Sequence, residues 1–185
     1  ISALLFCLIN PLSIFAQYGA WNIIKGEKLK FKVAFSSGLT GDIKGGEAVM
    51  YVQDRTLKIG SDEVYHATLT GGTTGVIEWF YQVKNKYDTY IDVDTKNPVL
   101  YTQSVQENKY KSNDTVHFNQ SKKTATYNGQ KISMPDNTQD FLSVFYYVRS
   151  MDMTNMKPGA SFKVPFFSSD KIAYFNIVYS GIETI

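Results

Sequence analysis

Four carboxylates are the strongest candidates for catalytic residues in this chain. Glu47, Glu78, Asp88 and Asp92 lie on separate segments of the first half of the sequence. Two carboxyl groups that flank a glycosidic bond can hydrolyse it, one as the acid and the other as the base or nucleophile. The spacing does not show which of the four would meet. A glycan-acting hydrolase is therefore the third of three hypotheses, and a non-catalytic role is favoured.

The two histidines, His66 and His117, are far apart in the sequence. A metal site needs several ligands at close spacing, and serine–histidine–aspartate catalysis needs a histidine beside a nucleophile. Neither pattern is visible in the sequence. We therefore expect no catalytic residues, no metal ligands and no cofactor.

Two charged residues belong to segment 138–151, the one long stretch with a clear helical pattern. At about 100° per residue, Asp140 and Arg149 lie on opposite sides of this helix, so they do not pair with each other. Arg149 borders the apolar face, where a guanidinium needs a carboxylate or several carbonyl groups from another element. Arg149 is therefore either a structural tie between helix and sheet or a ligand-binding group. Asp140 is assigned a structural role.

Three consecutive aromatic residues, Trp79, Phe80 and Tyr81, follow a loop that has three glycines within 71–75. Glycine permits hinge motion at low steric cost, and aromatic rings offer a large contact area to lipid tails or sugar faces. One hypothesis makes 71–83 a mobile flap whose aromatic residues bind a ligand. The alternative is that all three rings pack into the core and the glycines form an ordinary turn. Segment 76–83 fits a short helix and a strand almost equally well.

The helix 138–151 is the element around which the rest of the chain is organised. Its apolar side chains cover about half of the helix circumference, and they are Phe141, Leu142, Val144, Phe145, Val148 and Met151. So wide an apolar arc needs a partner that covers it from more than one side. Phe141 and Phe145 are assigned structural roles, with Phe145 near the centre of the buried arc.

Almost everything else in the sequence has the pattern of β-strands. In 27–35, lysines alternate with apolar residues, as in an antiparallel sheet that has one face in water. Further strands are expected at 48–53, 56–59, 64–70, 87–92, 99–106, 109–118, 124–127, 130–134, 162–166 and 172–179. Asn128 and Gly129 predict a tight hairpin, because both residue types tolerate positive φ. We predict a mainly β protein, an antiparallel open or half-closed barrel with one main helix packed on its concave face.

Charge and composition argue against two kinds of partner, nucleic acid and a spanned membrane. The net charge is +2 and no basic patch with interleaved aromatic residues is visible, so nucleic acid is not expected as a partner. Residues 1–16 form an apolar run that is interrupted by Pro11 and is too short to span a membrane. We interpret 1–16 as the remnant of a secretory signal peptide, which would remove Cys7, and 17–185 as a single β-rich domain. The mature chain would then have no integral membrane segment.

The chain resembles an exported bacterial family of unknown function, the domain-of-unknown-function family 3108. The matching motifs are 26–31 followed by a glycine turn and 46–48, then 87–92, and then 139–143 with 146–150. The resemblance covers 26–185 and is most specific in the helix. It implies an exported, β-rich protein of Gram-negative bacteria whose last strands are missing from this chain. It supplies no catalytic residues.

The sequence leaves two leading functions. The first is a binding protein of the periplasm or cell envelope that holds a lipid, a glycan or another amphipathic ligand, with Trp79, Phe80, Tyr81 and Arg149 as candidate ligand-binding residues. The second is a structural or protein-interaction module of the envelope. A cavity beside the helix would favour the first, and a solid interior with an exposed apolar patch would favour the second.

Overall fold

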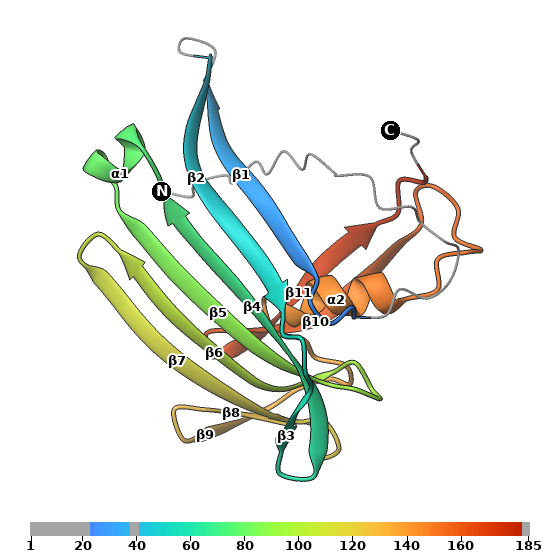
Figure 1. Cartoon of the computed structure of the whole chain (residues 1–185). Coiled ribbons are helices and arrows are strands. Elements are labelled where there is room, and N and C mark those ends of the chain that lie inside the picture. Colours follow the sequence, from blue (N-terminus) through green and yellow to red (C-terminus); the bar gives the residue numbers. More distant parts are fainter. Residues whose placement is uncertain (1–22, 38–40, 183–185) are drawn as a thin grey trace.

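A computed structural model describes residues 23–37 and 41–182 (Figure 1). The predicted signal remnant and Cys7 lie outside the described residues.

Eight strands follow one another across a single sheet in the order β1–β2–β4–β5–β6–β7–β8–β9, β3 pairs with β4, and β10 and β11 form a separate hairpin. The strands are β1 Lys28–Ser37, β2 Gly41–Val52, β3 Leu57–Ile59, β4 Asp62–Thr73, β5 Val83–Asp92, β6 Pro98–Glu107, β7 Tyr110–Asn119, β8 Thr124–Tyr127, β9 Gln130–Ser133, β10 Ser161–Ser168 and β11 Lys171–Val178. The two helices are α1 Val76–Phe80 and α2 Ser143–Ser150.

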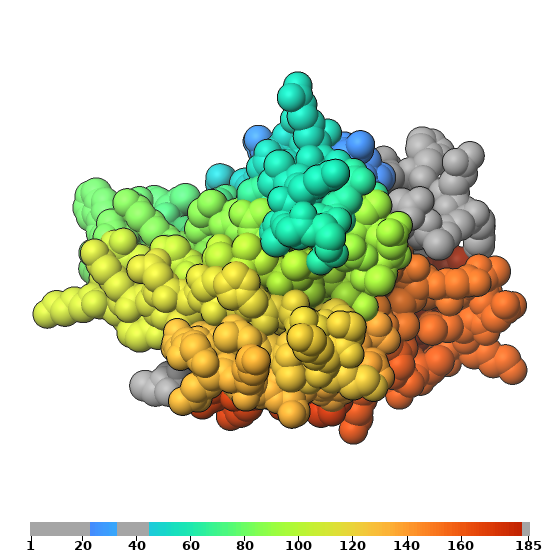
Figure 2. Space-filling view, turned by 90° about the horizontal axis from the view of Figure 1, so that it is seen from below, coloured from blue at the N-terminus to red at the C-terminus, as the bar shows by residue number. Residues whose placement is uncertain are grey.

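The prediction of a mainly antiparallel β protein is confirmed, because every named strand pair is antiparallel. The sheet is not closed into a barrel. Within the described residues, the edge strands β1 and β9 each pair with one neighbour, and β10–β11 does not bridge them. Figure 1 shows α2 and the β10–β11 hairpin beside the sheet, and Figure 2 shows these C-terminal segments (orange to red) packed against it.

The strand register places the core on one face of the sheet. Side chains alternate between the two faces of a strand, so residues that are paired across neighbouring strands share a face. One row across five strands is Met50, Leu69, Tyr87, Gln103 and Asp114, and the adjacent row is Val52, Ala67, Thr89, Tyr101, Val116 and Tyr127. Most of the buried apolar residues of the sheet lie in these two rows, and α2 packs over their first half.

Helix α2 begins five residues later than the periodic pattern predicts. Gln139 forms a parallel bridge with Phe166 of β10: its amide donates to the Pro165 carbonyl oxygen, and its own carbonyl oxygen accepts from the Phe167 amide. This pairing holds the backbone extended. Asp140 then caps the helix, because its carboxylate accepts hydrogen bonds from the amides of Leu142 and Ser143, both at 2.8 Å.

The buried side of α2 also differs from the prediction. Leu142 and Tyr146 are both 2% exposed and share a core cluster with β2, β4 and β5. Phe141 and Phe145 are 49% and 36% exposed, so the prediction that Phe145 lies at the centre of the buried arc is wrong. The contact with the sheet is made through Leu142 and Tyr146, four residues apart, and Phe141 and Phe145, which each precede one of them, lie outside that core cluster.

Asp140 should make the stability of the fold depend on pH. Burial raises the pKa of its carboxyl group from 3.8 to about 6, against the hydrogen bonds from Thr89, Ser143 and Leu142, which lower it. Between about pH 4 and pH 6 the folded state therefore holds a proton that the unfolded chain has lost. The free energy of unfolding should fall as the pH rises through this window, by up to about 3 kcal/mol from this group.

The comparison variant is Asp140→Asn, which keeps the shape of the side chain but cannot titrate. Chemical unfolding of both proteins at pH 4 and pH 7 measures the difference between their unfolding free energies. The unfolding free energy of the parent should fall relative to that of the variant as the pH rises. All other carboxylates are common to both proteins and cancel in the difference. A difference in unfolding free energy that stays constant from pH 4 to pH 7 would contradict the raised pKa.

Candidate functional site

The most site-like hollow lies between the core face of the sheet and the C-terminal segments that cover it. It has a volume of about 180 Å³. The sheet contributes one wall, and Phe141, two residues before α2, together with the end of β10 and the turn after it contributes the other. Its lining residues are Tyr87, Tyr101, Gln103, Asp114, Val116, Tyr127, Phe141, Phe166, Phe167, Ser168 and Ser169. We call it the interlayer pocket.

Aromatic rings form the walls of the interlayer pocket and hold one another in place. Phe167 makes a tilted contact with Tyr127, with the ring centroids 5.7 Å apart. Tyr87 of β5 and Phe141, which precedes α2, make a tilted contact with their ring centroids 5.3 Å apart. Phe166 is stacked on Phe175 of β11 at 4.0 Å. Rings fixed by packing on several sides present a preformed apolar surface.

A hydrogen-bond network centred on Asp114 forms the polar part of the pocket. The Asp114 carboxylate accepts hydrogen bonds from Ser112 Oγ at 2.7 Å, Gln103 Nε2 at 2.6 Å and Tyr127 Oη at 2.9 Å. Gln103 in turn accepts a bond from the Tyr101 hydroxyl at 3.0 Å. The bonds from Ser112, Gln103 and Tyr127 lower the pKa of Asp114, although burial opposes them. The carboxylate is therefore ionised at neutral pH.

This arrangement is suited to binding. One Asp114 oxygen, Oδ1, accepts only the bond from Tyr127 among the described contacts, so it has room for a further donor. Aromatic faces beside an ionised carboxylate can hold a ring or chain that is apolar on one side and carries hydroxyl or ammonium donors on the other. No histidine or cysteine lines the pocket, and Asp114 is the one carboxylate in the lining. The lining thus lacks the second carboxylate that the glycosidase hypothesis requires.

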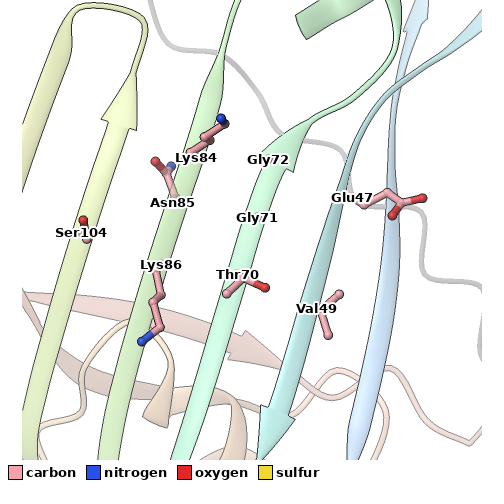
Figure 3. Close-up of a pocket in the computed structure, with 9 residues that line it drawn as sticks. All are labelled: Glu47, Val49, Thr70, Gly71, Gly72, Lys84, Asn85, Lys86 and Ser104. Carbon is pink, nitrogen blue, oxygen red and sulfur yellow. The ribbon is translucent and has the colours of Figure 1, made fainter.

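A second, shallower hollow of about 370 Å³ lies on the opposite face of the sheet (Figure 3). It runs across β2, β4, β5 and β6, where Gly71 and Gly72 leave no side chain between Glu47 and Lys84. A Cβ on Gly72 would lie 2.9 Å from the Val83 carbonyl oxygen, so this close approach of strands requires glycine. We call this hollow the glycine groove.

The predicted aromatic trio lies outside both hollows. Segment 76–80 is a helix, α1, and its Trp79 and Phe80 side chains are 86% and 79% exposed, while Tyr81 is 46% exposed. The alternative in which all three rings pack into the core is therefore wrong. The core cluster is already filled by residues of the strands and of α2, and none of the residues of the five-residue helix α1 is buried.

Arg149 belongs to α2, and Figure 1 shows α2 near the other end of the sheet from α1. Its guanidinium donates two hydrogen bonds to the Glu27 carboxylate, at 2.7 and 2.8 Å. The side chains of Arg149 and Glu27 are 17% and 7% exposed. The expectation that the Arg149 guanidinium binds a carboxylate of another element is confirmed. This geometry is that of a structural tie between α2 and the start of β1.

The other charged candidates belong to local networks. Asp88 accepts from His66 Nε2 at 2.8 Å and forms an ion pair with Lys86 at 2.9 Å. The Asp92 carboxylate accepts the amides of Asp94 and Thr95 and so closes the turn after β5. Among the described residues, no three histidine, cysteine, aspartate or glutamate side chains are grouped closely enough to hold a metal ion. Nor is any helix in the described ranges long and apolar enough to cross a membrane.

Sequence reasoning missed the residues of the interlayer pocket. Tyr87, Gln103 and Asp114 share one row only because β5, β6 and β7 pair in a particular register. A strand pattern of period two shows which residues share a face, but it does not show which residues of two strands are paired. A signal was available in the polar Gln103 and Asp114, which interrupt the apolar face of their strands.

Comparisons with known proteins agree with the sequence motifs. A family model described as "Protein of unknown function (DUF3108)" matches residues 30–185. The searches of curated proteins and of solved structures found no match to this chain. The family match covers most of the chain, from the third residue of β1 through the other strands, both helices and the hairpin. The chain therefore belongs to the DUF3108 family of proteins of unknown function.

Proposed function

We propose that this protein is a non-catalytic binding protein that takes an amphipathic ligand into the interlayer pocket. The observation that carries the proposal is the pocket itself, in which fixed aromatic walls surround the ionised Asp114. A solid interior at this place would have favoured a purely structural module. The gap between the sheet and the segments 141 and 166–169 is the feature that supports a binding protein.

The volume narrows the class of ligand. Pockets that enclose a drug-sized ligand have volumes of roughly 300–1,000 Å³, whereas the interlayer pocket has about 180 Å³. It therefore suits one ring or one head group of a larger molecule, whose remainder stays outside. A sugar ring fits both surfaces, since its apolar face stacks on aromatic rings and its hydroxyl groups donate to a carboxylate. A glycan or a glycolipid head group is our leading candidate.

The proposal includes the location inferred from the sequence. An apolar run at 1–16 supports export to the periplasm or cell envelope, where glycans and lipids are abundant. The candidate residues Trp79, Phe80 and Tyr81 are accessible for ligand contact but do not line the interlayer pocket. Their exposure supports the second candidate function, a protein-interaction module of the envelope.

The test uses octyl glucoside below its micellar concentration as a probe that has one sugar ring and one apolar chain. Calorimetric titration should show saturable binding to the parent protein. Asp114→Asn should weaken the affinity about tenfold, because a hydrogen bond to a charged acceptor is replaced by one to a neutral acceptor. The matched control is Asp136→Asn, a change at an exposed carboxylate outside the pocket.

Native mass spectrometry of the full-length exported protein provides a second measurement. A co-purified glycan or glycolipid that Asp114→Asn loses and Asp136→Asn retains would support the proposal. Equal binding of the probe by both variants, or no binding by any of them together with no co-purified ligand, would overturn it.

A further inference from the structure

One end of the sheet carries a concentration of exposed apolar side chains. Val76, Trp79 and Phe80 of α1 are 65%, 86% and 79% exposed, and Tyr81 and Tyr110 close to them are also exposed. Helix α1 contains no buried residue. We call Val76, Trp79, Phe80, Tyr81 and Tyr110 the aromatic tip. Large aromatic side chains are rarely left this exposed in one place unless they contact something.

Hydrogen bonds hold the aromatic tip together, because they connect the residues after α1 with the turn between β6 and β7. The Gln82 amide donates to Asn108 Oδ1 at 2.8 Å, and the Asn108 amide donates to the Gln82 carbonyl oxygen at 2.8 Å. The Tyr81 hydroxyl donates to Glu107 at 3.4 Å. These bonds fix α1 beside the turn between β6 and β7, and Figure 1 shows both at the same end of the sheet. The tip therefore presents its rings together.

Charged side chains surround the tip. Lys84, Lys109 and Lys111 are exposed and flank the aromatic residues in the chain. Glu47 lies across Gly72 from Lys84, Glu78 is half-buried, and Glu107 accepts hydrogen bonds from Tyr81 and Asn85. The positive charge beside the exposed rings therefore comes from Lys109 and Lys111, on either side of Tyr110. Lysine side chains with an apolar stem and a charged end are suited to the boundary between an apolar phase and an anionic layer.

We propose that the aromatic tip inserts into the surface of a lipid bilayer that contains anionic phospholipids. Tryptophan and tyrosine concentrate at the level of lipid head groups, and lysines beside them are attracted to anionic lipids. Helix α1 and the β6–β7 turn lie together at one end of the sheet, so one lipid surface can meet both (Figure 1). This docking is independent of the interlayer pocket, which lies on the core face of the sheet.

Trp79 provides the direct readout. The chain has two tryptophans, so the measurement is made in a Trp21→Phe background, where Trp79 is the remaining tryptophan and is excited selectively over the tyrosines. Vesicles of equal parts phosphatidylglycerol and phosphatidylcholine should shift the Trp79 emission to shorter wavelength, because the ring leaves water. Vesicles of pure phosphatidylcholine should give a weaker effect, since they offer no attraction to the lysines.

Vesicle flotation then tests which side chains are responsible. Trp79→Ser with Phe80→Ser should weaken binding about 100-fold, because two large apolar side chains no longer enter the bilayer. Lys109→Glu with Lys111→Glu should weaken binding to the anionic vesicles by about tenfold or more and should not affect neutral vesicles. The matched control is Tyr174→Ser with Val178→Ser, which removes two exposed apolar residues from β11.

Three results would overturn the proposal. The first is a Trp79 emission that neither vesicle changes. The second is equal flotation of the tip variant and the β11 control. The third is a blue-shifted emission without vesicles, accompanied in sedimentation by a dimer that Trp79→Ser with Phe80→Ser abolishes, because the tip would then bind a second copy of the chain. Thermal melting of each variant checks that the fold is retained.

Discussion

Replacing Tyr146 with alanine is expected to lower the free energy of unfolding by about 3–5 kcal/mol. Tyr146 is 2% exposed and lies in the core cluster with Met50, Val52, Ala67 and Ile91. Truncation would remove an aromatic ring from the place where α2 packs on the sheet and would leave a cavity that the sheet cannot fill. Urea unfolding, followed by circular dichroism, measures the loss.

The matched control is Phe145→Ala, the neighbouring aromatic residue of the same helix. Phe145 is 36% exposed, so its removal should cost about 1 kcal/mol, mainly through its edge contact with Tyr146, whose ring centroid is 5.4 Å away. Equal losses for the two variants would mean that α2 is not oriented as described. A larger loss for Phe145→Ala would restore the arrangement that helical periodicity alone predicts.

Replacing Glu27 with alanine is expected to cost about 3–5 kcal/mol, because it leaves the largely buried guanidinium of Arg149 without its carboxylate partner. The pair is bidentate, and Arg149 also lies 5.3 Å from the ring centroid of Phe145 and 5.8 Å from that of Tyr146. These contacts tie the start of β1 to the end of α2, which are separated by more than a hundred residues. Chemical unfolding of the variant measures the loss.

A double-mutant cycle isolates the ion pair. Arg149→Met in the Glu27→Ala protein should recover part of the lost stability, since the unpaired charge is removed and its stem is replaced by an apolar chain of similar length. The matched control is Asp136→Ala, which breaks the exposed pair with Lys123 and should cost less than about 1 kcal/mol. A loss for Glu27→Ala no larger than that of the control would contradict a buried structural role.

The sequence determined the class of the fold, because that depends on local patterns. The alternation of lysines with Leu29 and Phe31 predicts a strand with one wet face, and the structure leaves Lys28, Lys30 and Lys32 exposed. Asn128 and Gly129 predict a two-residue hairpin, and both have positive φ between the paired Tyr127 and Gln130. The place of Arg149 at the edge of an apolar face predicted its buried partner.

The tertiary structure alone decided where the candidate site lies and where α2 begins. Tyr87, Gln103 and Asp114 meet because three strands pair in one register, and period-two alternation is compatible with many registers. Helical periodicity continues back through Gln139. At the start of a helix the Gln139 amide would lack a backbone partner, whereas in the bridge to β10 both its amide and its carbonyl oxygen are hydrogen-bonded.

By composition, Trp79 and Phe80 could have been core residues. They are exposed because burial depends on which layer lies above a segment, and no local pattern encodes a layer that comes from a distant part of the chain.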